Sequence, residues 1–144
     1  MFLIALAALG VFLIDQGTKW LALKLLVLET NNPVIPGVFH LSLVRNTGIA
    51  FGLFRGHGTL LTIFVTAGML ALGIGAYLFR KQTLGKRIIY GLIWGGALGN
   101  WLDRIRFHHV VDFLDFRIWP VFNFADSFIT CGVVLLMYFV IRGK

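Results

Sequence analysis

The sequence predicts a mainly α-helical membrane protein, with four transmembrane helices and a small extracytoplasmic β-sheet subdomain. Two observations lead to this prediction. Hydrophobic residues make up 58% of the chain and charged residues only 13%, whereas soluble domains are closer to half apolar with about a quarter of their residues charged. The chain also contains four long apolar runs separated by segments rich in glycine, proline and charge. Its 144 residues suit one bundle, so a single domain over residues 1–144 is expected.

The expected membrane spans are residues 2–28, 60–79, 88–102 and 123–141. The first is interpreted as a retained helix and not a cleavable signal peptide, because no basic segment precedes its apolar run. The second is an uncharged run of about 20 residues, the length that a bilayer core requires. The third is short, but Gly91, Gly95 and Gly99 stand at every fourth position. Small residues at this spacing allow a neighbouring helix to approach closely.

The two long connections, residues 29–59 and 103–122, are expected to carry the sheet. Partial alternation of apolar and polar residues predicts one short strand at 38–44, and a second strand is predicted at 110–118. The stretch 46–58 contains four glycines and two phenylalanines. It is expected to form either a lid over the site, hinged at its glycines, or a static anchor at the membrane interface.

The basic residues predict the orientation in the membrane. Residues 80–87 contain four basic residues, and the C-terminal tail adds Arg142 and Lys144. The positive-inside rule therefore places this turn and both termini in the cytoplasm and both long connections outside. The net charge is +7, but the basic residues form no contiguous patch, so no nucleic-acid partner is expected.

Four of the six acidic residues fall within residues 99–127, between two apolar runs. Carboxylates are costly at a membrane boundary, because partial desolvation disfavours their charge. A helical rise of about 1.5 Å per residue places Asp15, Asn100 and Asp126 at similar heights, roughly 20–24 Å from the inner ends of their spans. The polar residues of three spans are therefore expected to meet near the outer face.

Three of the acids have plain structural interpretations. Asp15 and Lys19 are four residues apart on one helix, which predicts an ion pair. Asp103 is expected to hold the adjacent Arg104 or a loop. Asp115 is expected to pair with Arg117, two positions further on the same face of the second strand.

Asp112 and Asp126 have no oppositely charged residue within four positions. Asn123 is a candidate N-cap for the last helix, so Asp126 would lie in the first turn, where the helix dipole favours its ionised form. That charge would raise the pKa of a nearby Asp112. One carboxylate could then act as base and the other as acid on a water molecule. The alternative stays open: Asp126 caps a helix, and Asp112 is a solvated strand residue.

Other chemistries are less well supported. The histidines His40, His57, His108 and His109 lack the spacing of metal ligands, and Cys131 is the only cysteine, so no metal and no cofactor are expected. A serine–lysine dyad would require Ser42 or Ser127 near Lys19, whose pairing with Asp15 would keep the amine charged.

Five blocks of the sequence resemble the lipoprotein signal peptidase (signal peptidase II) family of bacteria. They are DQGTK at 15–19, NTGIAFG at 46–52, GNWLDR at 99–104, VVDF at 110–113 and FNFAD at 122–126. The resemblance implies a four-helix aspartic peptidase of the inner membrane that needs no cofactor. Such an enzyme removes the signal peptide of a prolipoprotein immediately before its diacylglyceryl-modified cysteine, using two aspartates and a water near the outer face. The expected partners are that substrate and membrane lipid, and the enzyme is expected to be a monomer.

Position by position, the resemblance implies a role for nine residues. Asp112 and Asp126 would form the catalytic pair. The substrate cleft would be lined or ordered by Asn46, Asn100, Arg104 and Asn123, and the site would be stabilised by Asp15, Lys19 and Asp103. The roles of His108 and His109 stay open.

Two functions from other classes compete with this reading. A small proton-coupled transporter would also need acids in the membrane, but such carriers often show paired repeats with sites at the midplane. The sequence shows no repeat, and its acids lie near one face. A non-enzymatic assembly subunit would use its charges to bind a partner, and would tolerate Asp112→Asn like any surface change.

Overall fold

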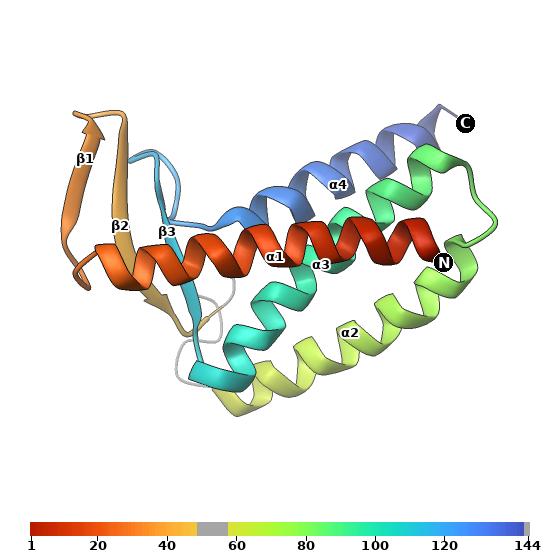
Figure 1. The fold of residues 1–144 in the computed structure, drawn as a ribbon, viewed down its shortest axis with the longest axis horizontal. Helices are drawn as coiled ribbons and strands as arrows, with labels where there is room; N and C mark the ends of the chain where they lie inside the picture. The colour runs from red at the N-terminus through yellow and green to blue at the C-terminus, as the bar shows by residue number, and fades with distance from the viewer. Residues whose placement is uncertain (49–57, 143–144) are drawn as a thin grey trace.

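The computed structural model describes residues 1–48 and 58–142 and shows a helical bundle with a small sheet at one end (Figure 1). Both termini and the turn between α2 and α3 lie at the opposite end (Figure 1). The elements, in chain order, are α1 (Phe2–Leu25), β1 (Asn31–Ile35), β2 (Phe39–Asn46), α2 (Gly58–Phe79), α3 (Leu84–Phe107), β3 (Val110–Asp115) and α4 (Phe124–Ile141). The predicted combination of four helices and a small sheet is confirmed.

Three of the helices are long and apolar enough to cross a membrane, among the residues that the structure describes: α1, the part of α2 from Thr62 to Phe79, and α4. Many of their large apolar side chains point outward and are exposed, including Leu13, Phe64 and Val140. Lipid can cover such side chains, whereas a soluble protein rarely exposes so much contiguous apolar surface. The outer surface of the bundle is therefore built for a bilayer.

The third helix, α3, lies at the centre of the bundle and packs against α1, α2 and α4. At 24 residues it is longer than the expected span of 88–102. Its ends are polar but still helical, with Arg104 and Arg106 in the last turn. His108, in the left-handed conformation (φ 60°), ends it, and its N–H binds the Arg104 carbonyl. Its composition is less apolar partly because Asn100 and Asp103 are buried and contact polar side chains of α1 and α4.

Close helix packing depends on the predicted glycine stripe of α3. A Cβ atom at Gly91 would lie 2.6 Å from Ala7 Cβ and 2.7 Å from the Ile4 carbonyl oxygen of α1. Gly95 and Gly99 face the same helix one and two turns further on, against Ala8 and Asp15. The expected role of these glycines in helix packing is therefore confirmed.

The sheet has the strand order β1-β2-β3, with both neighbouring pairs antiparallel. The strand β1 was not predicted, because its residues Asn31, Asn32 and Pro33 are typical of turns. Proline is tolerated here since β1 is an edge strand. The strand predicted at 110–118 ends earlier, at Asp115. The proposed lid or anchor at 46–58 lies largely outside the described residues, which resume at residue 58.

A small apolar core fixes the sheet to the bundle. Ala22 near the end of α1 packs with Leu43 of β2 and with Val111 and Phe113 of β3. This contact holds β2 and β3 against the end of α1. The sheet therefore serves as a rigid support for side chains at the end of the bundle.

The glycine contacts lead to a stability prediction. Gly91→Ala should lower the free energy of unfolding by about 1–3 kcal/mol, because the added methyl group overpacks the contact between α1 and α3. Gly10→Ala is the matched control, since nothing lies within 4 Å of a Cβ at that position. Thermal unfolding of the purified protein in detergent measures both variants. Equal melting temperatures for the two variants would contradict this account of the packing.

Candidate active site

A buried ammonium group organises the polar layer where the helices meet the sheet. Lys19 Nζ lies 2.8 Å from Asp15 Oδ2 and 2.8 Å from Asp103 Oδ2. All three residues are almost fully buried. The predicted pair of Asp15 and Lys19 is confirmed. The expectation that Asp103 holds its neighbour Arg104 is wrong: its ionic partner is Lys19, which comes from another helix.

The same two carboxylates also accept backbone N–H groups from distant segments. Asp15 Oδ1 accepts the N–H of Ala125, in the first turn of α4, at 3.0 Å. Asp103 Oδ2 accepts the N–H of Val111, in β3, at 3.2 Å. Asp103 therefore does hold the segment after α3, the other expectation for this residue. These contacts join four elements, α1, α3, α4 and β3, at one point.

Gln16 is a member of this layer that the sequence analysis did not single out. Its amide donates to Asp103 Oδ1 at 3.0 Å and also contacts Asp15 Oδ2 and the Gly99 carbonyl. The sequence does contain an indication of this role: Gln16 is a polar residue within an apolar span, and such a side chain is costly there and usually has a partner.

The polar layer continues from Lys19 to Asp126 through Asn100. Lys19 Nζ donates to Asn100 Oδ1 at 2.9 Å, and Asn100 Nδ2 donates to Asp126 Oδ1 at 2.8 Å. Because an ammonium group can only donate, it fixes which end of the amide faces Asp126. The predicted meeting of Asp15, Asn100 and Asp126 at one level is thus seen in their contacts.

Asp112, on β3, is held by two asparagine side chains. Asn123 Nδ2 donates to Asp112 Oδ1 at 2.6 Å, and Asn46 Nδ2, from β2, donates to Asp112 Oδ2 at 2.8 Å. Asn123 Nδ2 also lies 3.1 Å from Asn100 Oδ1, which connects the two halves of the layer. Both oxygens of the Asp112 carboxylate are therefore oriented by fixed donors.

Asp126 lies in the first turn of α4, as predicted. Asn123 is the N-cap, and its Oδ1 accepts the Asp126 N–H at 2.9 Å. This position places the carboxylate at the positive end of the helix dipole, which favours its ionised form. Asn123 thus contacts both aspartates. Its side-chain oxygen accepts the backbone N–H of Asp126, and its amide nitrogen donates to the Asp112 carboxylate.

The charge of Asp126 acts on the Asp112 carboxylate. Burial raises the pKa of Asp112 and the charge of Asp126 raises it further, to about 7, although hydrogen bonds from Asn46 and Asn123 act in the opposite direction. Asp112 therefore exchanges its proton near neutral pH. Two carboxylates that share one proton can act together as acid and base on a water molecule.

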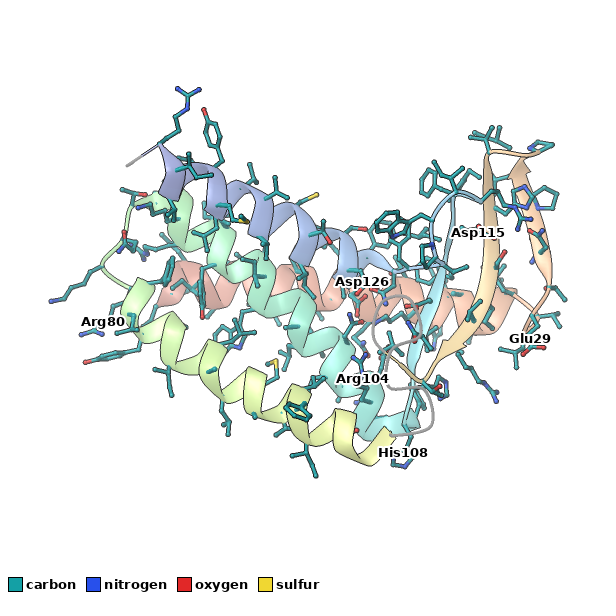
Figure 2. The ribbon with its side chains drawn as sticks, turned by 180° about the vertical axis from the view of Figure 1, so that it is seen from behind. Glu29, Arg80, Arg104, His108, Asp115 and Asp126 are labelled. Atoms are coloured by element: carbon teal, nitrogen blue, oxygen red, sulfur yellow. The ribbon has the colours of Figure 1, made fainter. Side chains whose placement is uncertain are left out.

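Both aspartates line one cleft of about 860 Å³, a volume typical of ligand sites. Asn46, Asn100 and Arg104 also line it, whereas Asn123 is fully buried behind it. Figure 2 shows Asp126 and Arg104 near each other where bundle and sheet meet, with Glu29 far away, in the connection between α1 and β1. The cleft also has an apolar wall that was not foreseen: it includes Val65, Met69 and Leu72 of α2 and Ile129 of α4.

Arg104 joins the cleft to the segment after β2. Its guanidinium donates to the Asn100 carbonyl at 3.3 Å and to the Gly48 carbonyl at 3.1 Å. Its buried Nε has no hydrogen-bond partner among the described residues. The charge of Arg104 faces the cleft together with the two aspartates, so this arginine can bind a polar group of a ligand.

Asp115, the remaining acid of the cluster, lies outside the cleft. It forms the predicted ion pair with Arg117 at 3.1 Å and accepts the Ser42 hydroxyl at 3.0 Å. Arg117 has left the strand and has a positive φ of 66°. The pair therefore fixes the turn after β3.

The chain matches the family model described as signal peptidase (SPase) II over residues 7–142. It is 42% identical to the lipoprotein signal peptidase of Halothermothrix orenii over 138 residues, covering 95% of this chain and 94% of that protein. The corresponding enzyme of Trichormus variabilis is 44% identical, with 92% and 85% covered, and that of Shouchella clausii is 38% identical, with 96% and 93% covered.

Solved structures agree with this assignment. A bacterial membrane enzyme determined by the in meso method at 2.3 Å resolution superposes with a TM-score of 0.86 at 33% identity, covering 96% of this chain and 87% of that one. A second, at 1.9 Å resolution, gives a TM-score of 0.83 at 32% identity, with 98% and 94% covered. The chain is a multi-pass membrane protein of bacterial type, and it belongs to the signal peptidase II family of aspartic endopeptidases, which process lipoproteins.

Proposed function

We propose that Asp112 and Asp126 form the catalytic pair of this peptidase and hydrolyse the bond before the diacylglyceryl-modified cysteine of a prolipoprotein. The observation that carries this proposal is that the two carboxylates line one cleft, where burial and the charge of Asp126 raise the pKa of Asp112 to about 7. Near neutral pH the pair then holds one proton, as acid–base activation of water requires.

The proton steps follow from the surroundings of each carboxylate. Ionised Asp126 takes a proton from the water, and the oxygen attacks the carbonyl carbon of the scissile bond. Asp112 gives its proton to the carbonyl oxygen, which yields a tetrahedral intermediate. Asp126 then protonates the leaving amine while Asp112 recovers its proton from the hydroxyl group, so that the carbonyl re-forms and the bond to nitrogen breaks.

The neighbouring residues position these groups and the substrate. Asn46 and Asn123 orient Asp112, and Asn100 orients Asp126. Arg104, at the cleft wall, binds the polar backbone of the substrate. Asp15, Lys19 and Asp103 stabilise the layer without contacting the reacting atoms.

The cleft suits a lipidated substrate. Its apolar wall on α2 and α4 complements an apolar signal helix, which can arrive laterally from the bilayer. The names of the relatives point to lipoproteins as substrates. The acyl chains would remain in the membrane while the scissile bond reaches the polar layer at the interface.

The location of the site favours an inner-membrane enzyme with its active site near the outer face. Both termini lie at the same end as the basic turn between α2 and α3, opposite the sheet (Figure 1). By the positive-inside rule, that end faces the cytoplasm. On this proposal the whole chain is one peptidase domain with four spans, it acts as a monomer, and no cofactor takes part.

Removing either catalytic carboxylate tests the proposal directly. Asp112→Asn and Asp126→Asn should each reduce cleavage of a diacylglyceryl-modified precursor at least about 100-fold, because each removes one proton-transfer group. Asp115→Asn is the matched control, since Asp115 lies on the same strand as Asp112 but outside the cleft. Cleavage is measured on purified enzyme, with an unmodified precursor in parallel that should remain intact. Near-normal turnover by either variant would refute the assignment.

The pH dependence gives a second prediction. Cleavage should fall as the pH rises through about 7, because Asp112 then loses the proton that it must donate. It should also fall at low pH, where protonation of both carboxylates removes the base. The pH profile of kcat/KM for the modified precursor measures both limbs. A rate that stays constant well above pH 7 would show that Asp112 is not the acid.

The supporting layer should affect stability more than chemistry. Asp15→Asn breaks a buried ion pair, so it should lower the free energy of unfolding by about 3–5 kcal/mol. Turnover per folded molecule should change less. Glu29→Gln is the control, since Glu29 is an exposed acid on the sheet side. Thermal unfolding combined with single-turnover assays separates the effects, and a variant that is stable but inactive would place Asp15 in the chemistry.

A further inference from the structure

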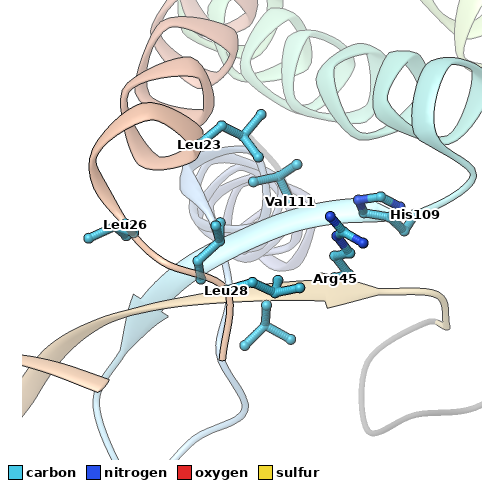
Figure 3. A pocket seen from close by; sticks show the side chains of 8 residues that line it. Leu23, Leu26, Leu28, Arg45, His109 and Val111 are labelled. Atoms are coloured by element: carbon cyan, nitrogen blue, oxygen red, sulfur yellow. The ribbon is translucent and has the colours of Figure 1, made fainter. Parts of the chain in front are cut away.

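A second, smaller cavity lies between the end of α1 and the strands β2 and β3 (Figure 3). Its volume is about 230 Å³. Figure 3 shows leucine side chains from the end of α1 and the following segment at one end, with Arg45 and His109 side by side at the other. The lining therefore combines an apolar half, which includes Leu23, Leu26, Leu28 and Val111, with a basic half.

The basic half has no counter-ion among the residues that the structure describes. All six acidic residues of the chain belong to the described part, where three of them form ion pairs with Lys19 or Arg117. Neither Arg45 nor His109 has an ion pair with any of them. The Arg45 side chain is exposed, and the His109 ring packs near that of Phe107, with the ring centroids 5.9 Å apart. A cationic group is thus held beside an apolar cavity and is open to an external anion.

The position of the cavity matches the level of lipid headgroups. Trp20 and Lys24 lie on the last turns of α1, with Lys24 Nζ 3.9 Å from the Trp20 ring centroid. Tryptophan and lysine are typical of the membrane–water interface. Leu25, the last residue of α1, is 76% exposed, and Leu23, on the cavity wall, is 45% exposed. Lipid can therefore reach the apolar half from the side of α1.

We propose that this cavity binds an anionic phospholipid, with the headgroup phosphate on Arg45 and His109 and the first carbons of an acyl chain against the leucines. Arginine binds phosphate through paired N–H donors. A free phosphate ion would satisfy only the basic half, whereas a phospholipid satisfies both halves. The negative charge of the lipid complements the unpaired arginine better than a zwitterionic headgroup does.

Such a lipid would also bear on the neighbouring cleft. Arg45 borders both cavities and directly precedes Asn46, which donates a hydrogen bond to Asp112. A headgroup on Arg45 would hold the end of β2 at the membrane surface. The binding site itself does not depend on the proposed catalytic roles, so its test measures binding and not activity.

The test is native mass spectrometry of the delipidated full-length protein in detergent, with phosphatidylglycerol or phosphatidylcholine added. The wild type should retain phosphatidylglycerol preferentially. Arg45→Gln should weaken its binding about fivefold, as expected for one basic side chain near a lipid surface. His109→Gln, which replaces the second lining residue, should weaken it in the same direction. Arg106→Gln is the matched control, an exposed arginine near the same end of α3 that lies outside the cavity.

The outcomes are separable. Equal retention of the two lipids, or equal loss in Arg45→Gln and Arg106→Gln, would overturn the proposal, because general surface charge would then explain the binding. Competition by millimolar inorganic phosphate as effective as that by lipid would show a simple anion site and would also overturn it. If Arg45→Gln fails to fold, unchanged lipid retention in His109→Gln would refute the site, and weakened retention would support it.

Discussion

The structure depends on one buried ammonium group. Lys19 sits between the carboxylates of Asp15 and Asp103, and those carboxylates also accept N–H groups from α4 and β3. Charges in a low-dielectric interior are tolerated only when they are paired and hydrogen-bonded. Each contact therefore restricts the others. A shift of any one of the four elements would leave a charge or a backbone donor without its partner.

The fold could be predicted from the sequence where the physical signal is local. Apolar runs of bilayer length gave the helices, the i,i+4 spacing gave the Asp15–Lys19 pair, and the N-cap pattern placed Asp126 in the first turn of α4. The rise per residue also brought three spans to a common level. Contacts between residues far apart in the chain were harder to predict from the sequence. Asp103 binds Lys19, 84 positions away, and not its neighbour Arg104, and β1 was missed because an edge strand tolerates the Asn and Pro residues typical of turns.

In the candidate site, too, some features could be predicted from the sequence, whereas contacts between distant residues could not. Burial and the nearby charge of Asp126 raise the pKa of Asp112, as anticipated for two acids that meet in one cleft. Its two asparagine partners were not derivable from spacing, since Asn46 reaches Asp112 only through the pairing of β2 with β3. The family resemblance implied that both asparagines belong to the site, but it did not indicate that they contact Asp112. The apolar wall on α2 carries no sequence pattern that separates it from ordinary lipid-facing residues.

The asparagines between Lys19 and the two aspartates have a consequence for proton movement. Asn100 passes the orientation set by the ammonium group on to Asp126, but an amide does not take up or release a proton in the physiological range. Asn123 separates the two halves in the same manner. The lysine thus influences the cleft through its electric field alone. The amide side chains therefore form no path by which a proton could pass between Lys19 and the two aspartates.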